Sequence, residues 1–196
     1  MSNIELTHDP LFAAGRRVFF ARAGFMLSGA AVALLSGRQS LAAELRKVST
    51  DAAVGDVKIL SGALAAEHQA IAAYQVGAES GLLQKPVLDL AVQFQDHHKA
   101  HAALLAATVK QLGGAPVAPK QKYDFPVAQL RSQNDVLRFA AGLEQGAVSA
   151  YVQAVPAFDN RDLAKAAASI LGDEAMHWAI LRQALGENPV PAAFVG

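Results

Sequence analysis

The sequence contains two similar halves, and in each half a glutamate is followed about two helical turns later by a tyrosine. The segment Glu67–Tyr74 reads EHQAIAAY, and the segment Glu144–Tyr151 reads EQGAVSAY. Further along each half, residues 97–105 (HHKAHAALL) align with residues 173–181 (DEAMHWAIL). A repeat of this kind predicts two equivalent pairs of elements that bury their apolar faces against each other.

Apolar residues recur at helical spacing in four segments, at about residues 50–80, 86–112, 132–155 and 160–186. Gly81, Gly113 and Gly186 follow three of the segments, and Pro86, Ser132 or Asn134, and Asp159 or Asn160 are suited to helix starts. The connection over residues 113–133 contains three prolines and is long for a loop between adjacent antiparallel helices. We therefore predict an all-α four-helix bundle with a long crossover between the second and third helices.

Polar residues interrupt the apolar stripe of every predicted helix. Glu174 and His177 are three residues apart, so they lie on one helix face among apolar neighbours. Charged groups on an inward face are costly unless a partner or a metal ion satisfies them. From Glu67 to His101 is 101 − 67 = 34 positions, and from Glu144 to His177 is 177 − 144 = 33. Each helical hairpin should therefore bring its glutamate and its histidine to the same height.

With these motifs the chain resembles the ferritin-like superfamily, and within it the exported bacterial ferritin-like domain proteins. The resemblance covers about residues 50–186. It implies that a glutamate from the first and third helices, and Glu-x-x-His from the second and fourth, bind two iron or manganese ions. The matching positions in this chain are Glu67, His101, Glu144, Glu174 and His177. The second helix departs from the pattern, because it has His98 where a glutamate is expected, and Gln95 in the alternative register is no better as an anionic bridge.

The expected ligand set is then three carboxylates and three imidazoles, which leaves two divalent ions with one uncompensated positive charge unless an oxide or hydroxide bridge compensates it. Imidazole ligands favour iron, zinc, copper or nickel over magnesium or calcium. Two arrangements are open: a histidine-rich dinuclear site, for iron with manganese or zinc as alternatives, or one tight metal with a weak second position. An inert polar core without metal is the third alternative.

Tyr74 and Tyr151 are expected either to pack or to donate hydrogen bonds to a site glutamate or histidine, whereas His68 and His97 are expected to be solvated.

The first 42 residues are typical of an export signal. Arg16 and Arg17 precede a moderately apolar run of 13 residues, Ala23–Leu35, and a small-x-small site, Ser40–Ala42, follows. A helix needs roughly 20 residues to cross a bilayer, so this run is too short for a stable span. We predict a twin-arginine signal over residues 1–42, a mature domain over residues 43–196 and a periplasmic location, with the twin-arginine export machinery as a partner. An uncleaved anchor and an amphipathic helix are the alternatives.

Composition narrows the function classes. The chain has no cysteine, so disulfides and thiolate metal sites are excluded, and its formal net charge of zero gives no basic face for nucleic acid. No nucleotide motif or substrate loop is visible, which favours a small oxidant as the reaction partner. Oxidation of Fe(II) or reduction of peroxide is the leading hypothesis. A metal-binding or stress-related structural bundle without turnover, or a bundle that binds a partner through its surface, are the alternatives. A homodimer is compatible with the sequence.

Overall fold

The computed structural model describes residues 39–195, and its side chains from Asp51 onward. The predicted all-α class and four-helix bundle are confirmed, since the described residues contain no strand. The predicted export motif and apolar run lie outside the described residues. Four long helices and two short 3-10 turns make up the described chain: α3 (Gln39–Glu79), α4 (Lys85–Gln111), η2 (Val127–Gln129), α5 (Gln133–Ala154), η3 (Val155–Ala157) and α6 (Arg161–Ala184).

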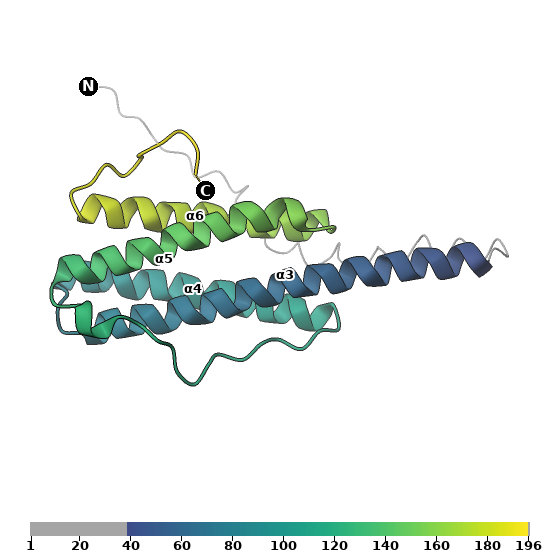
Figure 1. Cartoon of the computed structure of the whole chain (residues 1–196), viewed down its shortest axis with the longest axis horizontal. Helices are drawn as coiled ribbons and strands as arrows, with labels where there is room; N and C mark the ends of the chain where they lie inside the picture. Colours follow the sequence, from purple (N-terminus) through teal and green to yellow (C-terminus); the bar gives the residue numbers. More distant parts are fainter. Residues whose placement is uncertain (1–38, 196) are drawn as a thin grey trace, which may run out of the picture. The chain divides into compact units, whose positions relative to one another are not determined.

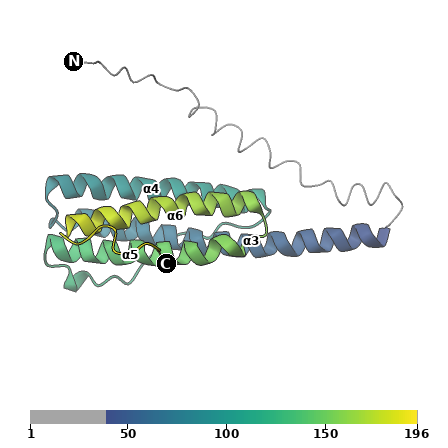
Figure 2. The ribbon, with the colours of Figure 1, turned by 90° about the horizontal axis from the view of Figure 1, so that it is seen from above.

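Within residues 52–195, α3 and α4 form one antiparallel hairpin and α5 and α6 form another (Figures 1 and 2). The two hairpins pack so that α3 lies beside α5 and α4 lies beside α6. The connection between α4 and α5 runs along the bundle (Figure 1), as the sequence predicts. One contact of this crossover is with α3, where His68 Nε2 lies 3.2 Å from the carbonyl oxygen of Val117.

The helix ends follow the local sequence closely. The Ser132 hydroxyl accepts a hydrogen bond from the backbone N–H of Asp135, and Asn160 Oδ1 accepts from the N–H groups of Asp162 and Leu163. These are the capping contacts expected of serine and asparagine at a helix start. Gly81 adopts a φ of 70° just after α3, a conformation that is open to glycine at little cost.

One boundary differs from the prediction. The first helix of the bundle was expected from about Thr50, but α3 begins at Gln39. Residues 39–50 contain no glycine or proline and are rich in alanine, leucine, glutamate, lysine and arginine, so nothing in them ends a helix. The expected processing site before Ala43 therefore lies in the first turns of α3.

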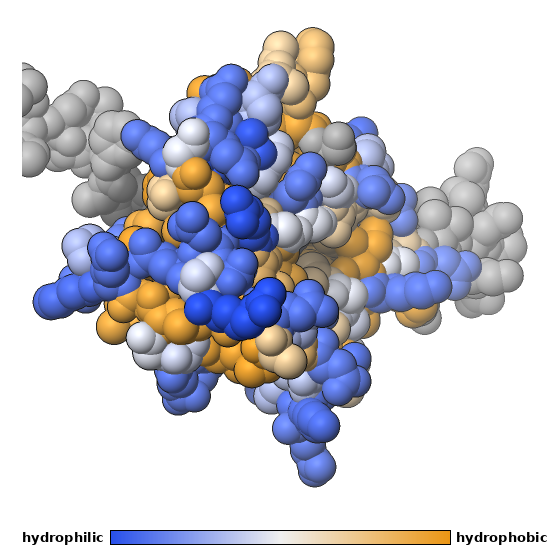
Figure 3. Space-filling model, turned by 60° about the vertical axis from the view of Figure 1, so that its left-hand side comes forward, coloured by the Kyte–Doolittle hydropathy of each residue, from blue (hydrophilic) through white to orange (hydrophobic). Residues whose placement is uncertain are grey.

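The core consists of two apolar clusters with a polar layer between them. Phe94, Leu137 and Leu181 belong to the smaller cluster, and Leu64, Val109 and Ile170 belong to the larger one. Hydrophilic side chains cover most of the face seen in Figure 3, with hydrophobic ones exposed between them. None of the described helices is long and apolar enough to cross a membrane.

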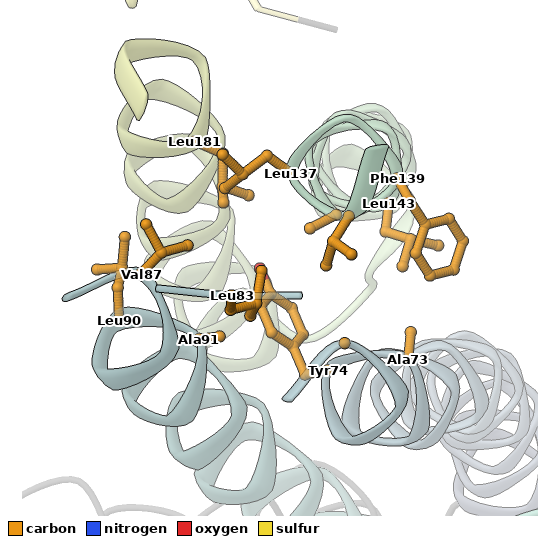
Figure 4. Close-up of a pocket in the computed structure, with 13 residues that line it drawn as sticks. Ala73, Tyr74, Leu83, Val87, Leu90, Ala91, Leu137, Phe139, Leu143 and Leu181 are labelled. Carbon is orange, nitrogen blue, oxygen red and sulfur yellow. The ribbon is translucent and has the colours of Figure 1, made fainter. Parts of the chain in front are cut away.

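A small cavity borders the smaller cluster, where side chains from all four helices surround it (Figure 4). Its volume is about 20 Å³, which is room for roughly one water molecule. Apart from Tyr74, its lining is entirely apolar. This cavity is a packing gap rather than a ligand site.

Candidate metal centre

Six polar side chains meet in the layer between the two clusters. Glu67 comes from α3, Glu144 from α5, and the pairs His98–His101 and Glu174–His177 from α4 and α6. Five of the six are almost fully buried: Glu67 is 3% exposed, His98, Glu144 and His177 are 1% exposed, and Glu174 is 0% exposed. The side chain of His101 is 14% exposed. The structure therefore brings together all six residues that the sequence singles out as ligands.

The six residues form two overlapping groups of four. One contains Glu67, His98, His101 and Glu174; the other contains His98, Glu144, Glu174 and His177. In each group one ligand atom per residue lies within 4.8 Å of the others, which is the spacing that a shared metal ion requires. His98 and Glu174 belong to both groups, so the position that departs from the family pattern is also one of the two shared positions.

His98 reaches both groups through its two ring nitrogens. Its Nδ1 lies 2.8 Å from Glu67 Oε2, and its Nε2 lies 3.3 Å from Glu144 Oε1. Gln95, the alternative in the other register, is directed elsewhere. Its amide nitrogen donates to the carbonyl oxygen of Ile71 and to Gln75 Oε1. The geometry thus places His98, and not Gln95, at the shared position.

The two outer histidines point their Nδ1 atoms at the carboxylates. His101 Nδ1 lies 3.2 Å from Glu174 Oε1, and His177 Nδ1 lies 3.4 Å from Glu174 Oε2. The ring of Phe94 stacks on that of His177 with a centroid separation of 4.0 Å, which fixes its orientation. Glu174 is therefore positioned between two imidazoles, one from each group.

The two tyrosines of the sequence repeat hold the glutamates of the opposite half. The Tyr74 hydroxyl, on α3, donates to Glu144 Oε1, and the Tyr151 hydroxyl, on α5, donates to Glu67 Oε1 at 2.7 Å. The sequence left open whether these tyrosines pack or donate hydrogen bonds. In the structure they do both. The repeat therefore produces two equivalent cross-links between the hairpins, and each cross-link orients one carboxylate.

Several polar atoms of the layer have no hydrogen-bond partner although they are buried. They are His101 Nδ1, Glu144 Oε2, both carboxylate oxygens of Glu174, and His177 Nδ1; the imidazole nitrogens lie 3.2 and 3.4 Å from the Glu174 oxygens, but without hydrogen-bond geometry. Leaving such groups unsatisfied costs about 1–3 kcal/mol each, and more for charged groups. All five atoms face the layer where the two groups of four meet. Imidazole nitrogens and carboxylate oxygens are ligands for iron, manganese and zinc, so the residues present fit a divalent metal site.

Without metal, protons take the place of the cations. Burial alone would raise the pKa of Glu67, but contacts with His101 and His98 outweigh it and lower the pKa. Burial alone would lower the pKa of His98, but the contacts with Glu144 and Glu67 raise it to about 10. The carboxylates likewise raise the pKa values of His101 and His177 to about 9. The metal-free layer is therefore a network of imidazolium and carboxylate groups, and a metal ion must displace those protons.

Two further residues lie at the layer's outer edge and were not predicted as part of the site. Asp173 Oδ2 lies 3.3 Å from His101 Nε2 and 3.4 Å from His177 Nε2, on the far side of both rings from the glutamates. His97 Nδ1 lies 3.0 Å from both Asp173 Oδ2 and His177 Nε2. The His97 side chain is 38% exposed, so it is partly solvated as expected and also contacts the edge of the layer. The sequence did carry a signal, since His97 and Asp173 align in the repeat and each precedes a ligand pair.

Asp173 lies beside the outer nitrogens of both imidazoles. A carboxylate that accepts the Nε2 proton fixes the tautomer in which Nδ1 is free to bind a cation. The same carboxylate is also the only one of the layer's acidic groups among the described residues that is partly exposed, with a side chain 21% accessible.

Comparison with known proteins gives a consistent result. The ferritin-like domain family profile matches residues 55–187. A crystal structure of a conserved hypothetical protein from Mycobacterium tuberculosis is 24% identical, covers 73% of this chain and 99% of its own, and superposes with a TM-score of 0.64. A crystal structure of ferritin-like, diiron-carboxylate proteins from Bacillus anthracis is 21% identical, covers 68% of this chain and 97% of its own, and has a TM-score of 0.60.

No curated protein matches the sequence. At these identities the two crystal structures show the fold, whereas the family profile spans most of the bundle. The buried glutamate and histidine cluster is compatible with a metal site. The chain belongs to the ferritin-like domain family.

Proposed function

We propose that the layer binds two divalent metal ions, iron in the first place and manganese or zinc as alternatives, and that the protein oxidises Fe(II) or reduces peroxide there. The observation that carries the proposal is the set of unpartnered buried atoms, above all both oxygens of Glu174. Glu67, His98, His101 and Glu174 would hold one ion, and His98, Glu144, Glu174 and His177 the other. When bound, iron or manganese ions would supply the electrons for reduction of a small oxidant, whereas zinc, which has no redox chemistry, would leave the site without turnover.

The protein's own groups prepare that chemistry. Tyr74 and Tyr151 hold one oxygen each of Glu144 and Glu67, so these carboxylates stay in place when the metals are absent. Asp173 Oδ2 lies 3.3 and 3.4 Å from the outer nitrogens of His101 and His177, where its charge favours rings whose inner nitrogens are directed at the site. The apolar clusters on both sides limit access of water along the bundle axis.

Metal content and turnover test this proposal together. We expect the purified protein to bind about two equivalents of Fe(II) under anaerobic conditions and to oxidise it when oxygen or peroxide is added. Glu174→Ala removes a carboxylate common to both groups and should abolish stoichiometric binding at both positions. Glu79→Ala, an exposed glutamate on α3, serves as the control and should behave like wild type.

Two results would contradict the proposal of metal binding with turnover. Binding of two ions without turnover would favour the alternative of a non-catalytic metal-binding or structural bundle. No stoichiometric binding by the wild type would leave an inert polar core and remove the basis for metal chemistry altogether.

We also propose that the protein is exported by the twin-arginine route to the periplasm, because Arg16 and Arg17 precede a short apolar run. Export after folding would let the metals be inserted in the cytoplasm. Changing both arginines to lysine should leave unprocessed precursor in the cytoplasm, as measured by fractionation and immunoblotting. The control is Arg38→Lys, which changes a basic residue after the apolar run and should be exported normally. Normal periplasmic levels of the double variant would exclude this route.

A further inference from the structure

A groove between α3 and α5 opens onto the buried polar layer. Its volume is about 430 Å³, within the usual range of about 300–1,000 Å³ for small-molecule sites. The side chains along its walls are mostly glycine and alanine: Gly62, Ala63, Ala66 and Ala70 on α3, and Gly142, Gly146, Ala147, Ala150 and Ala154 on α5. α3 and α5 lie side by side in both ribbon views (Figures 1 and 2).

The groove exists because side chains are missing at facing positions. Gly62, Ala66 and Ala70 are four residues apart and share one edge of α3, and Gly142, Gly146 and Ala150 share one edge of α5. A Cβ atom added at Gly62, Gly142 or Gly146 would meet no atom within 4 Å. These small residues therefore leave open space between the helices instead of bringing the backbones into contact.

The floor of the groove is formed by charged groups of the polar layer. Glu67, His98, Glu144 and Glu174 line it together with Tyr151. Glu144 and Glu174 are 1% and 0% exposed, and Glu144 Oε2 and both oxygens of Glu174 have no hydrogen-bond partner. These oxygens lie just beneath the surface of the groove, where they give a charged end to a site that is otherwise apolar. The cavity of about 20 Å³ beside the smaller apolar cluster has neither the space nor the polar groups for such a ligand.

We propose that this groove binds an amphiphilic small molecule, with an apolar chain against the glycine and alanine walls and a single carboxylate head at the polar floor. The choice of head group rests on the proposed function, because two divalent ions and three carboxylates leave one positive charge at the floor. At about 30 Å³ per non-hydrogen atom, taken from the volume of a water molecule, 430 Å³ holds a molecule of roughly 14 such atoms. Dodecanoate has this size. A helix from a second copy would cover the walls but would leave the charge at the floor unmatched.

The test uses the full chain loaded with Zn(II), desalted, and checked for metal content before any ligand is added. Dodecanoate is then titrated below its micelle-forming concentration and followed by calorimetry. We expect one molecule to bind per chain. Dodecyltrimethylammonium, with the same chain and the opposite charge, should bind at least tenfold more weakly. Butanoate, with the same head and a short chain, should also bind at least tenfold more weakly, since each buried CH₂ group contributes to affinity.

Two matched variants locate the binding site. Gly146→Leu places a side chain in the groove from a position where a Cβ meets no atom, so it should keep its metal and bind dodecanoate at least tenfold more weakly. Gly172→Leu makes the same change at an exposed position of α6 outside the groove, where a Cβ also meets no atom, and should bind dodecanoate like wild type.

Each contrary result is distinct. Two bound metal ions with no binding of dodecanoate would overturn the inference and leave the proposed function intact. Equal affinities for the acid and the ammonium compound, or for wild type and Gly146→Leu, would also overturn it. A wild-type dimer that Gly146→Leu dissociates would show that a second copy occupies the groove. Absence of stoichiometric metal would instead count against the proposed function, and it is measured first.

Discussion

His98 decides the charge of the site. It stands at a position shared by both groups of ligands, where the ferritin-like pattern expects a glutamate, and it contacts Glu67 and Glu144 through different ring nitrogens. A neutral imidazole in place of a carboxylate removes one negative charge that would otherwise compensate the second metal ion. The nearly complete burial of His98 means that solvent does not make up for this loss.

We therefore expect His98→Glu to strengthen binding at the weaker metal position, and His98→Ala to weaken it. The metal-free His98→Glu form should be less stable than the metal-free wild type, because a fourth buried carboxylate adds repulsion and desolvation cost. Metal titrations with melting curves measure both effects, since bound metal raises apparent stability by mass action. Gln93→Glu adds the same charge on an exposed face of α4 and should change neither property by much. Equal metal numbers and affinities in wild type and His98→Glu would show that His98 is not a ligand.

At the scale of the helices, the internal repeat and the caps explain why the ligands meet. The spacings of 34 and 33 positions place each glutamate level with its histidine, and the helix starts at Ser132 and Asn160 agree with their capping chemistry. These features could be predicted because they depend on local sequence and on periodicity. A long-range contact that could not be predicted also fixes α6: the carboxylate of Asp56, on α3, accepts hydrogen bonds from the backbone N–H groups of Asp159 at 2.9 Å and Asn160 at 3.1 Å.

Asp56→Ala should therefore destabilise the bundle by about 1–3 kcal/mol, because two backbone donors just before α6 lose their acceptor in a site where Asp56 is only 3% exposed. Asp56→Asn retains one acceptor oxygen and should cost less. Unfolding in urea measures both, with Asp124→Ala in the exposed part of the crossover as the control. If Asp56→Ala and Asp124→Ala have the same midpoint, the contact between α3 and the start of α6 contributes no stability.

For the whole molecule, the two sides of the polar layer differ in a way that periodicity does not reveal. The side between α4 and α6 has His97 and Asp173, while the side between α3 and α5 has the groove. A stripe of apolar residues identifies which face of a helix is inward. It does not give the rotation of one helix against its neighbour, and that rotation decides whether a residue beside the stripe, such as His97, reaches the site. The inward polar residues and the fold were accessible from sequence, whereas the groove and the outer histidine required the packed helices.

The polar layer also makes the stability of the whole metal-free protein depend on pH. The pKa values of His98, His101 and His177 are raised from 6.5 to about 10, 9 and 9, so the stability that their protonation contributes is complete below about pH 6.5 and is lost as the pH rises through 9 to 10. The pKa of Glu67 is lowered from 4.5, so its contribution is present above pH 4.5 and is lost as the pH falls below that value. The metal-free protein should therefore be most stable between about pH 4.5 and 6.5.

From pH 6 to pH 9.5 we expect its free energy of unfolding to fall by more than about 2 kcal/mol, measured with urea after removal of metal by a chelator. The metal-loaded protein should show the opposite trend over the lower part of this range. Metal ions bind neutral imidazoles, so their affinity, and with it the stabilisation that they give, increases as the histidines lose their protons. The difference in melting temperature between the loaded and metal-free forms should accordingly widen between pH 6 and pH 8. A metal-free protein whose stability is unchanged or increases over the same interval would show that the buried imidazoles do not hold protons between the carboxylates.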